Sequence, residues 1–174
     1  MGSRAEKPKP DPGELVQVVG RHLYEVVPLN YATYCSFTAR IVQVVLAHFG
    51  QACELVPCQI WYCRPDQTYV IGFLGHPAPG KWDGHVVCRA GHWLMDTAVH
   101  HFAKEFGLDV PKVVAAPCFE FPTQAIAKWD VSDTDRVWWH HPPQGVDATP
   151  PQEPKELIDK YAQLLIKKVA QSWG

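Results

Sequence analysis

Residues of the three types that form a nucleophilic triad occur here in the order cysteine, histidine, aspartate. Cys35 begins an apolar stretch, His85 begins a run rich in β-formers, and Asp96 follows it. A cysteine attacks only as the thiolate, which a helix N-terminus and a neighbouring imidazole both favour. An aspartate orients the imidazole and stabilises its charged form. The sequence therefore predicts thiol-based nucleophilic chemistry with Cys35, His85 and Asp96 as the candidate catalytic residues.

The elements that must position these side chains can be predicted from the spacing of apolar residues. Residues 35–49 are apolar on more than one face and Gly50 follows them, which predicts a buried helix with the cysteine at its start. Residues 84–96 predict a tight β-hairpin that turns near residues 90 and 91. In that register His85 and Asp96 lie directly opposite each other, with both side chains on one face.

Acyl chemistry also requires hydrogen-bond donors for the oxyanion that forms during attack. We expect one donor from the backbone N–H groups at the helix start, at Ser36 or the residue before it. Asn30 and Tyr34 in the preceding connector are candidates for a second donor, with Asn30 preferred because its amide can donate. Trp82 and Gly84, just before the histidine, are expected to contact the substrate.

The remaining elements predict an α+β fold with an antiparallel sheet, because helices precede and follow a run of hairpin-connected strands. Residues 1–13 contain three prolines and predict a disordered tail, and residues 14–174 a single domain. The expected elements are a helix from residue 14, strands at 52–63, 68–74, 113–121 and 136–140, a short helix before Gly107, and a C-terminal helix over 153–172.

Composition removes several function classes from consideration. The net charge of −2 gives no electrostatic reason to expect nucleic acid as a partner. Neither a long apolar run nor an N-terminal leader pattern is present, so we expect a cytoplasmic protein that does not bind membranes. The six cysteines form no C-x-x-C pair and are expected to be reduced thiols. We expect no metal and no cofactor, and the sequence carries no signal for an oligomeric state.

These residues resemble a known family. Cys35 at a helix start, His85 with Gly91-His92-Trp93, and Asp96-Thr97 resemble the transglutaminase-like branch of the papain-like superfamily, which includes arylamine N-acetyltransferases and bacterial cysteine peptidases. The resemblance spans about residues 30–100. It implies a papain-like core, and a hydrolase or acyltransferase acting on an amide, peptide or thioester bond of a peptide or acyl-bearing substrate. The interval between the histidine and the aspartate is shorter than usual, and Val86 stands where an aromatic residue is expected.

Other interpretations stay open beside this one. The NlpC-type cell-wall peptidases share a cysteine opening a helix and Gly-His-Val opening a strand, although their third residue is more often histidine. A papain-like scaffold that only binds partners would explain the departures from the family pattern. Asp96 could instead cap the helix that follows it. A metal-dependent hydrolase would use the histidine pairs at 100–101 and 140–141, but adjacent helical residues point about 100° apart and rarely chelate one ion.

Overall fold

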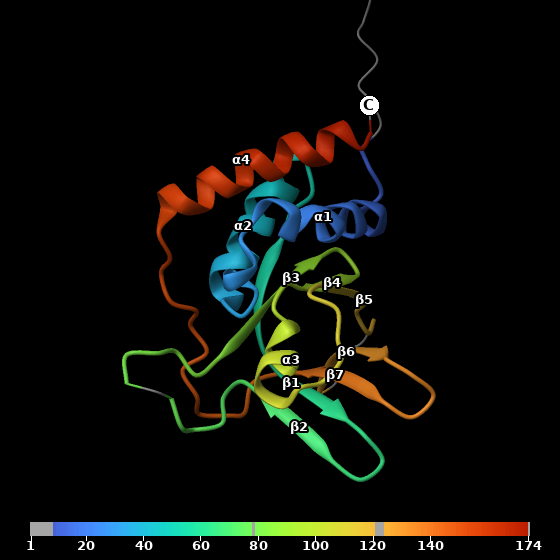
Figure 1. Cartoon of the computed structure of the whole chain (residues 1–174), viewed down its shortest axis with the longest axis vertical. Coiled ribbons are helices and arrows are strands. Elements are labelled where there is room, and N and C mark those ends of the chain that lie inside the picture. Colours follow the sequence, from blue (N-terminus) through green and yellow to red (C-terminus); the bar gives the residue numbers. More distant parts are fainter. Residues whose placement is uncertain (1–8, 78, 121–123, 174) are drawn as a thin grey trace, which may run out of the picture.

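The structure, a computed structural model, describes residues 9–77, 79–120 and 124–173. Figure 1 shows that α4 crosses α1 and α2 at one end of the molecule, whereas α3 lies apart from them. A short 3-10 turn, Leu29–Tyr31, connects α1 to α2. The helices are α1 (Pro12–Val26), α2 (Cys35–His48), α3 (His100–Phe106) and α4 (Lys155–Gln171).

Seven strands of the described chain form one antiparallel sheet in the order β5-β4-β3-β1-β7-β6, with β2 paired to β1. An isolated bridge between Cys118 and Ala127 brings the two ends of this order together, so the sheet is nearly closed. The strands are β1 (Glu54–Cys63), β2 (Thr68–Ile71), β3 (His85–Ala90), β4 (Trp93–Asp96), β5 (Val114–Pro117), β6 (Ala125–Asp130) and β7 (Arg136–His140).

Apolar side chains gather in two clusters because successive residues of a strand point to opposite faces of the sheet. One cluster contains α1, α2 and α4 packed on β3 and β4, with Val86 and Met95 from the sheet. The other contains Val87 and Leu94 from the same two strands, together with Phe102 of α3 and Trp139 of β7. The chain segments that carry the candidate triad lie where these two clusters meet.

The α+β class with an antiparallel sheet is confirmed, and so is the start of α2 at Cys35. Helix α1 begins at Pro12 rather than at residue 14, because Asp11 caps it by accepting a hydrogen bond from the Glu14 amide at 3.1 Å. Proline is favourable in the first helical turn, where its missing N–H costs nothing. Residues 1–8 of the predicted tail, and residue 121 of the predicted strand, lie outside the described residues.

Two further predictions need correction. Strand β6 (Ala125–Asp130) was not expected. Alanine and lysine are poor β-formers, and the alternation of apolar and polar residues in this segment is weak. The β3–β4 hairpin pairs Ala90 with Trp93, which leaves Gly91 and His92 as the turn. The predicted opposition of His85 and Asp96 is therefore wrong by two residues, and the register places Asp96 opposite Val87 instead. No helix in the described part of the chain is long and apolar enough to cross a membrane.

Candidate active site

Cys35 is the first residue of α2, and its side chain is 8% exposed. The N-cap residue is Tyr34, which makes no side-chain capping hydrogen bond, and its carbonyl accepts the Thr38 amide at 3.0 Å. A helix N-terminus presents unpaired N–H groups and the positive end of the helix dipole. The cysteine sulfur therefore lies at a position that favours negative charge, both on sulfur and on a neighbouring oxyanion.

His85 and Asp96 form a buried pair. The imidazole Nε2 lies 2.9 Å from Asp96 Oδ2, and both residues are 0% exposed. Since an ionised carboxylate can only accept, Nε2 carries the proton and donates it. Asp96 reaches the imidazole along a diagonal of the hairpin, because a shift of two residues keeps side chains on the same face.

Two more donors fix the carboxylate of Asp96. The indole Nε1 of Trp139 donates to Oδ2 at 2.7 Å, and the amide of Ala98 donates to Oδ1 at 2.9 Å. Asp96 thus both pairs with His85 and accepts a hydrogen bond from a backbone amide in the segment before α3. Burial raises the pKa of the Asp96 carboxyl, but the charge of His85 and these hydrogen bonds outweigh it, so the pKa lies below its ordinary value.

The second nitrogen of His85, Nδ1, is buried and makes no hydrogen bond of standard geometry within the described ranges. Burial disfavours the charged imidazole, but the negative charge of Asp96, the neighbouring Cys35 and the hydrogen bond to Asp96 outweigh it, raising the pKa of His85 to about 10. Because Nε2 is occupied by Asp96, Nδ1 is the nitrogen that faces the thiol. Hydrogen bonds of this kind are often poorly aligned before substrate binds.

Hydrogen bonds join the helix of the nucleophile to the segment of the aspartate. The hydroxyl groups of Thr38 on α2 and Thr97, the residue after Asp96, lie 2.7 Å apart in the core. The Tyr24 hydroxyl of α1 donates to the carbonyl of Thr97. These residues fix the distance between Cys35 and the pair. Sequence patterns did not indicate them, because a hydroxyl pair far apart in the chain has no local signature.

His101 is a second histidine beside the site that the sequence did not single out for this place. Its ring centroid lies 6.3 Å from that of His85, and its Nε2 lies 2.5 Å from the carbonyl oxygen of Thr33. Burial and the charge of His85 lower the pKa of His101, so that it is neutral at pH 7 and donates through Nε2. The bond ties α3 to the turn that precedes Cys35.

The residues expected to complete the oxyanion site occupy different places. Asn30 is exposed on the 3-10 turn, five residues before Cys35, and Tyr34 is 57% exposed. The Ser36 hydroxyl is buried and donates to the carbonyl of Pro151 at 3.3 Å. Ser36 therefore anchors the segment that precedes α4, which leaves its backbone N–H as the group available to a substrate.

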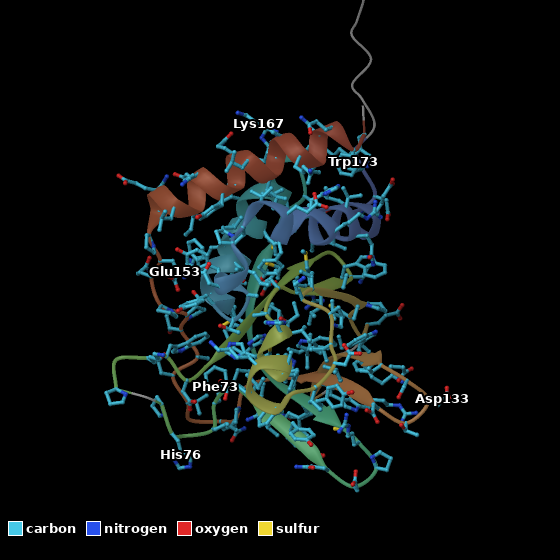
Figure 2. All side chains as sticks on the ribbon, in the orientation of Figure 1. Phe73, His76, Asp133, Glu153, Lys167 and Trp173 are labelled. Atoms are coloured by element: carbon cyan, nitrogen blue, oxygen red, sulfur yellow. The ribbon has the colours of Figure 1, made fainter. Side chains whose placement is uncertain are left out.

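Trp82 and Gly84 lie together directly before His85. A side-chain Cβ at Gly84 would come within 2.2 Å of the Trp82 ring, so only glycine fits beneath the indole. The ring packs edge-on to Phe73 at a centroid separation of 5.7 Å (Figure 2 labels Phe73). Nε1 of Trp82 is buried and lacks a hydrogen-bond partner among the residues described.

Features elsewhere on the molecule do not contribute to this site. The described residues bring together no group of three histidine, cysteine or acidic side chains able to hold a metal ion. All six cysteines are free thiols. A cavity of about 550 Å³ lies between α1 and the chain leading into β5, with Arg21 and Lys112 in its wall and none of the three triad residues.

Comparison with known proteins leaves the site to be interpreted from its own geometry. The chain matches no family model, and no curated protein matches it significantly. A solved structure, described in its title as that of a genomics target, is 11% identical, with a TM-score of 0.49 over 95% of this chain and 82% of the other. That likeness is too distant to carry an argument about function.

Proposed function

We propose that this chain is a thiol-dependent hydrolase or acyltransferase with a papain-like, transglutaminase-like site. The observation that carries the proposal is the buried His85–Asp96 hydrogen bond, 2.9 Å long, beside a cysteine at the N-terminus of a helix. The identity of the third residue of the proposed triad also bears on which branch of the superfamily the site resembles. An aspartate in this place favours the transglutaminase-like branch over the NlpC-type peptidases, whose third residue is more often histidine.

In the proposed reaction His85 takes the proton of the Cys35 thiol, and Asp96 stabilises the imidazolium that results. The sulfur adds to the carbonyl carbon of an amide or thioester, and the C=O π pair moves onto oxygen. Collapse of the adduct breaks the bond to the leaving group, which receives a proton from His85. Water or an amine then attacks the thioester, loses a proton to His85, and releases Cys35.

A binding scaffold is the second candidate, and restricted access to the site favours it. Cys35 is 8% exposed, and His85 and Asp96 are completely buried. A buried cysteine is commonly a small hydrophobic side chain. The two candidates differ in the reactivity of the thiol, because a scaffold does not require an activated sulfur.

The test is alkylation by iodoacetamide at pH 6, with the modified residues located by mass spectrometry. An ordinary thiol of pKa about 8.5 is only about 0.3% thiolate at this pH. We expect Cys35 to react at least about tenfold faster than the half-buried Cys53 and Cys63, and His85→Asn to remove that advantage. If Cys35 reacts no faster than Cys53, the scaffold is the better interpretation.

A further inference from the structure

The cavity between α1 and the chain leading into β5 is separate from the candidate active site, because the described residues around it include none of the candidate triad. Its volume of about 550 Å³ lies within the range of sites that hold small organic molecules, about 300–1,000 Å³. Such sites have mainly apolar walls and a few polar groups that orient the ligand. The walls of this cavity have that composition.

Helix α1 contributes one face to the cavity. Gln17, Gly20, Arg21 and Tyr24 follow one another at spacings of three and four residues, so they lie on the same side of the helix. Gly20 leaves the centre of that face without a side chain. A Cβ there would lie 3.1 Å from Val113 Cγ1, so the helix and the chain leading into β5 are in direct contact beside the cavity. Packing within the protein therefore sets the separation of the two walls.

The charged side chains around the cavity leave an excess of positive charge. The carboxylate of Glu25 lies 2.9 Å from His22 Nδ1 and 3.0 Å from Lys168 Nζ. These two bonds hold the pKa of Glu25 below its ordinary value, so the carboxylate is ionised and already paired at neutral pH. The side chains of Arg21 and Lys112, in contrast, have no ion pair and no hydrogen bond with any described residue.

Apolar surface borders these two cations. Val16 is completely buried, and Val113 and Ala115 are half-buried in the opposite wall. The ring of Tyr24 adds an aromatic surface, and its position is fixed because the hydroxyl donates to the carbonyl of Thr97. The cavity thus offers positive charge beside apolar surface, which matches a ligand that carries a negative group on an apolar body.

We propose that this cavity binds a small phosphate monoester with an apolar organic part, and that Arg21 and Lys112 hold its phosphate. A phosphate monoester carries close to two negative charges at neutral pH and balances both cations, whereas a carboxylate balances one. Arginine offers a planar fork of N–H donors to phosphate oxygens, and lysine adds a point charge. The assignment does not depend on the function proposed for Cys35.

The probe is phenyl phosphate, titrated at pH 7.5 into the full ¹⁵N-labelled chain and followed by NMR. We expect saturable shifts of the backbone amides at Gly20 and Val113, with a Kd at or below about 1 mM. Phenol lacks the phosphate, inorganic phosphate lacks the apolar part, and benzoate carries a single charge. Each should bind at least about tenfold more weakly than phenyl phosphate.

The double variant Arg21→Gln with Lys112→Gln should weaken the binding of phenyl phosphate by at least about tenfold. Lys104→Gln with Lys167→Gln is the matched control, because it removes the same charge from α3 and α4 (Figure 2 labels Lys167). The control should keep the Kd within about twofold of wild type. All four substituted side chains are exposed, so both variants should keep the wild-type Tm.

Three results would overturn the assignment. Equal weakening in the two double variants would show a general effect of charge rather than a site. Phenol that binds as tightly as phenyl phosphate would show an apolar cavity in which the cations play no part. Phenyl phosphate that produces no saturable shift at Gly20 or Val113 up to about 10 mM would show that the cavity does not take this class of ligand.

Discussion

The carboxylate of Asp96 accepts three hydrogen bonds, from His85, Trp139 and the Ala98 amide, and each has a different consequence. The bond from Ala98, two residues further on, forms a local turn, and the bond to His85 makes Asp96 part of the candidate site. Asp96 does not cap the helix that follows, because the N-cap residue of α3 is Val99, which makes no side-chain capping hydrogen bond. The bond from Trp139 was not predictable, because the indole arrives from β7, far along the chain.

Trp139→Phe should weaken the hydrogen-bonded pair of His85 and Asp96 without breaking it. The substitution removes the donor to Asp96 Oδ2, which leaves the buried carboxylate with less compensation and also opens a small cavity. We expect a loss of about 2–4 kcal/mol in the free energy of unfolding, measured in urea, and slower alkylation of Cys35. Trp138→Phe, the neighbour on the opposite face, should stay within about 0.5 kcal/mol. Equal losses in the two variants would contradict a specific role for the buried indole.

At the scale of elements, periodicity predicted the parts that local sequence controls. Helix α2 begins at the expected cysteine, and β7 has the expected bounds. The register of the β3–β4 hairpin was predicted less well. Its turn is formed by Gly91 and His92 rather than by residues 90 and 91. The predicted contact between His85 and Asp96 is present despite this error, since a shift of two residues returns the same face. A shift of one would have turned Asp96 away from His85.

The link between α2 and the segment after β4 can be tested with Thr97→Val, which keeps the side-chain shape and deletes the hydroxyl bonded to Thr38. Thr38 retains the carbonyl of Tyr34 as acceptor at 3.1 Å, so only one hydrogen bond is lost. We expect a loss of about 1 kcal/mol in stability and a lower alkylation rate at Cys35, because the helix start is less firmly placed. Thr68→Val, on the exposed part of β2, is the matched control. Alkylation at the wild-type rate would show that packing alone positions α2.

For the whole molecule, the buried pair links folding to pH. The pKa of His85 is raised to about 10 in the folded chain, against about 6.5 when unfolded. A raised pKa contributes stability that is fully present below about pH 6.5 and is lost as the pH rises through the folded value. Asp96 acts in the opposite sense, because its pKa is lowered and its contribution is lost as the pH falls through the folded value. The pair therefore stabilises the folded chain most at pH values below about 6.5 and above the ordinary pKa of an aspartate.

The slope can be measured between pH 6.5 and 7.5, below the pKa of about 8.5 at which thiols such as Cys58, whose pKa is raised by burial in the folded chain, titrate once the chain is unfolded. Cys35→Ala is the background, since a proton passed from the thiol to the imidazole would leave the number of bound protons unchanged. Asp96 still holds the pKa of His85 up in that variant. We expect the free energy of unfolding to fall by up to about 1.4 kcal/mol per pH unit, the value for one proton. Adding His85→Asn should remove the slope. A flat profile in Cys35→Ala itself would mean that the imidazole is neutral in this folded variant, and that the Asp96 carboxylate alone does not keep His85 protonated.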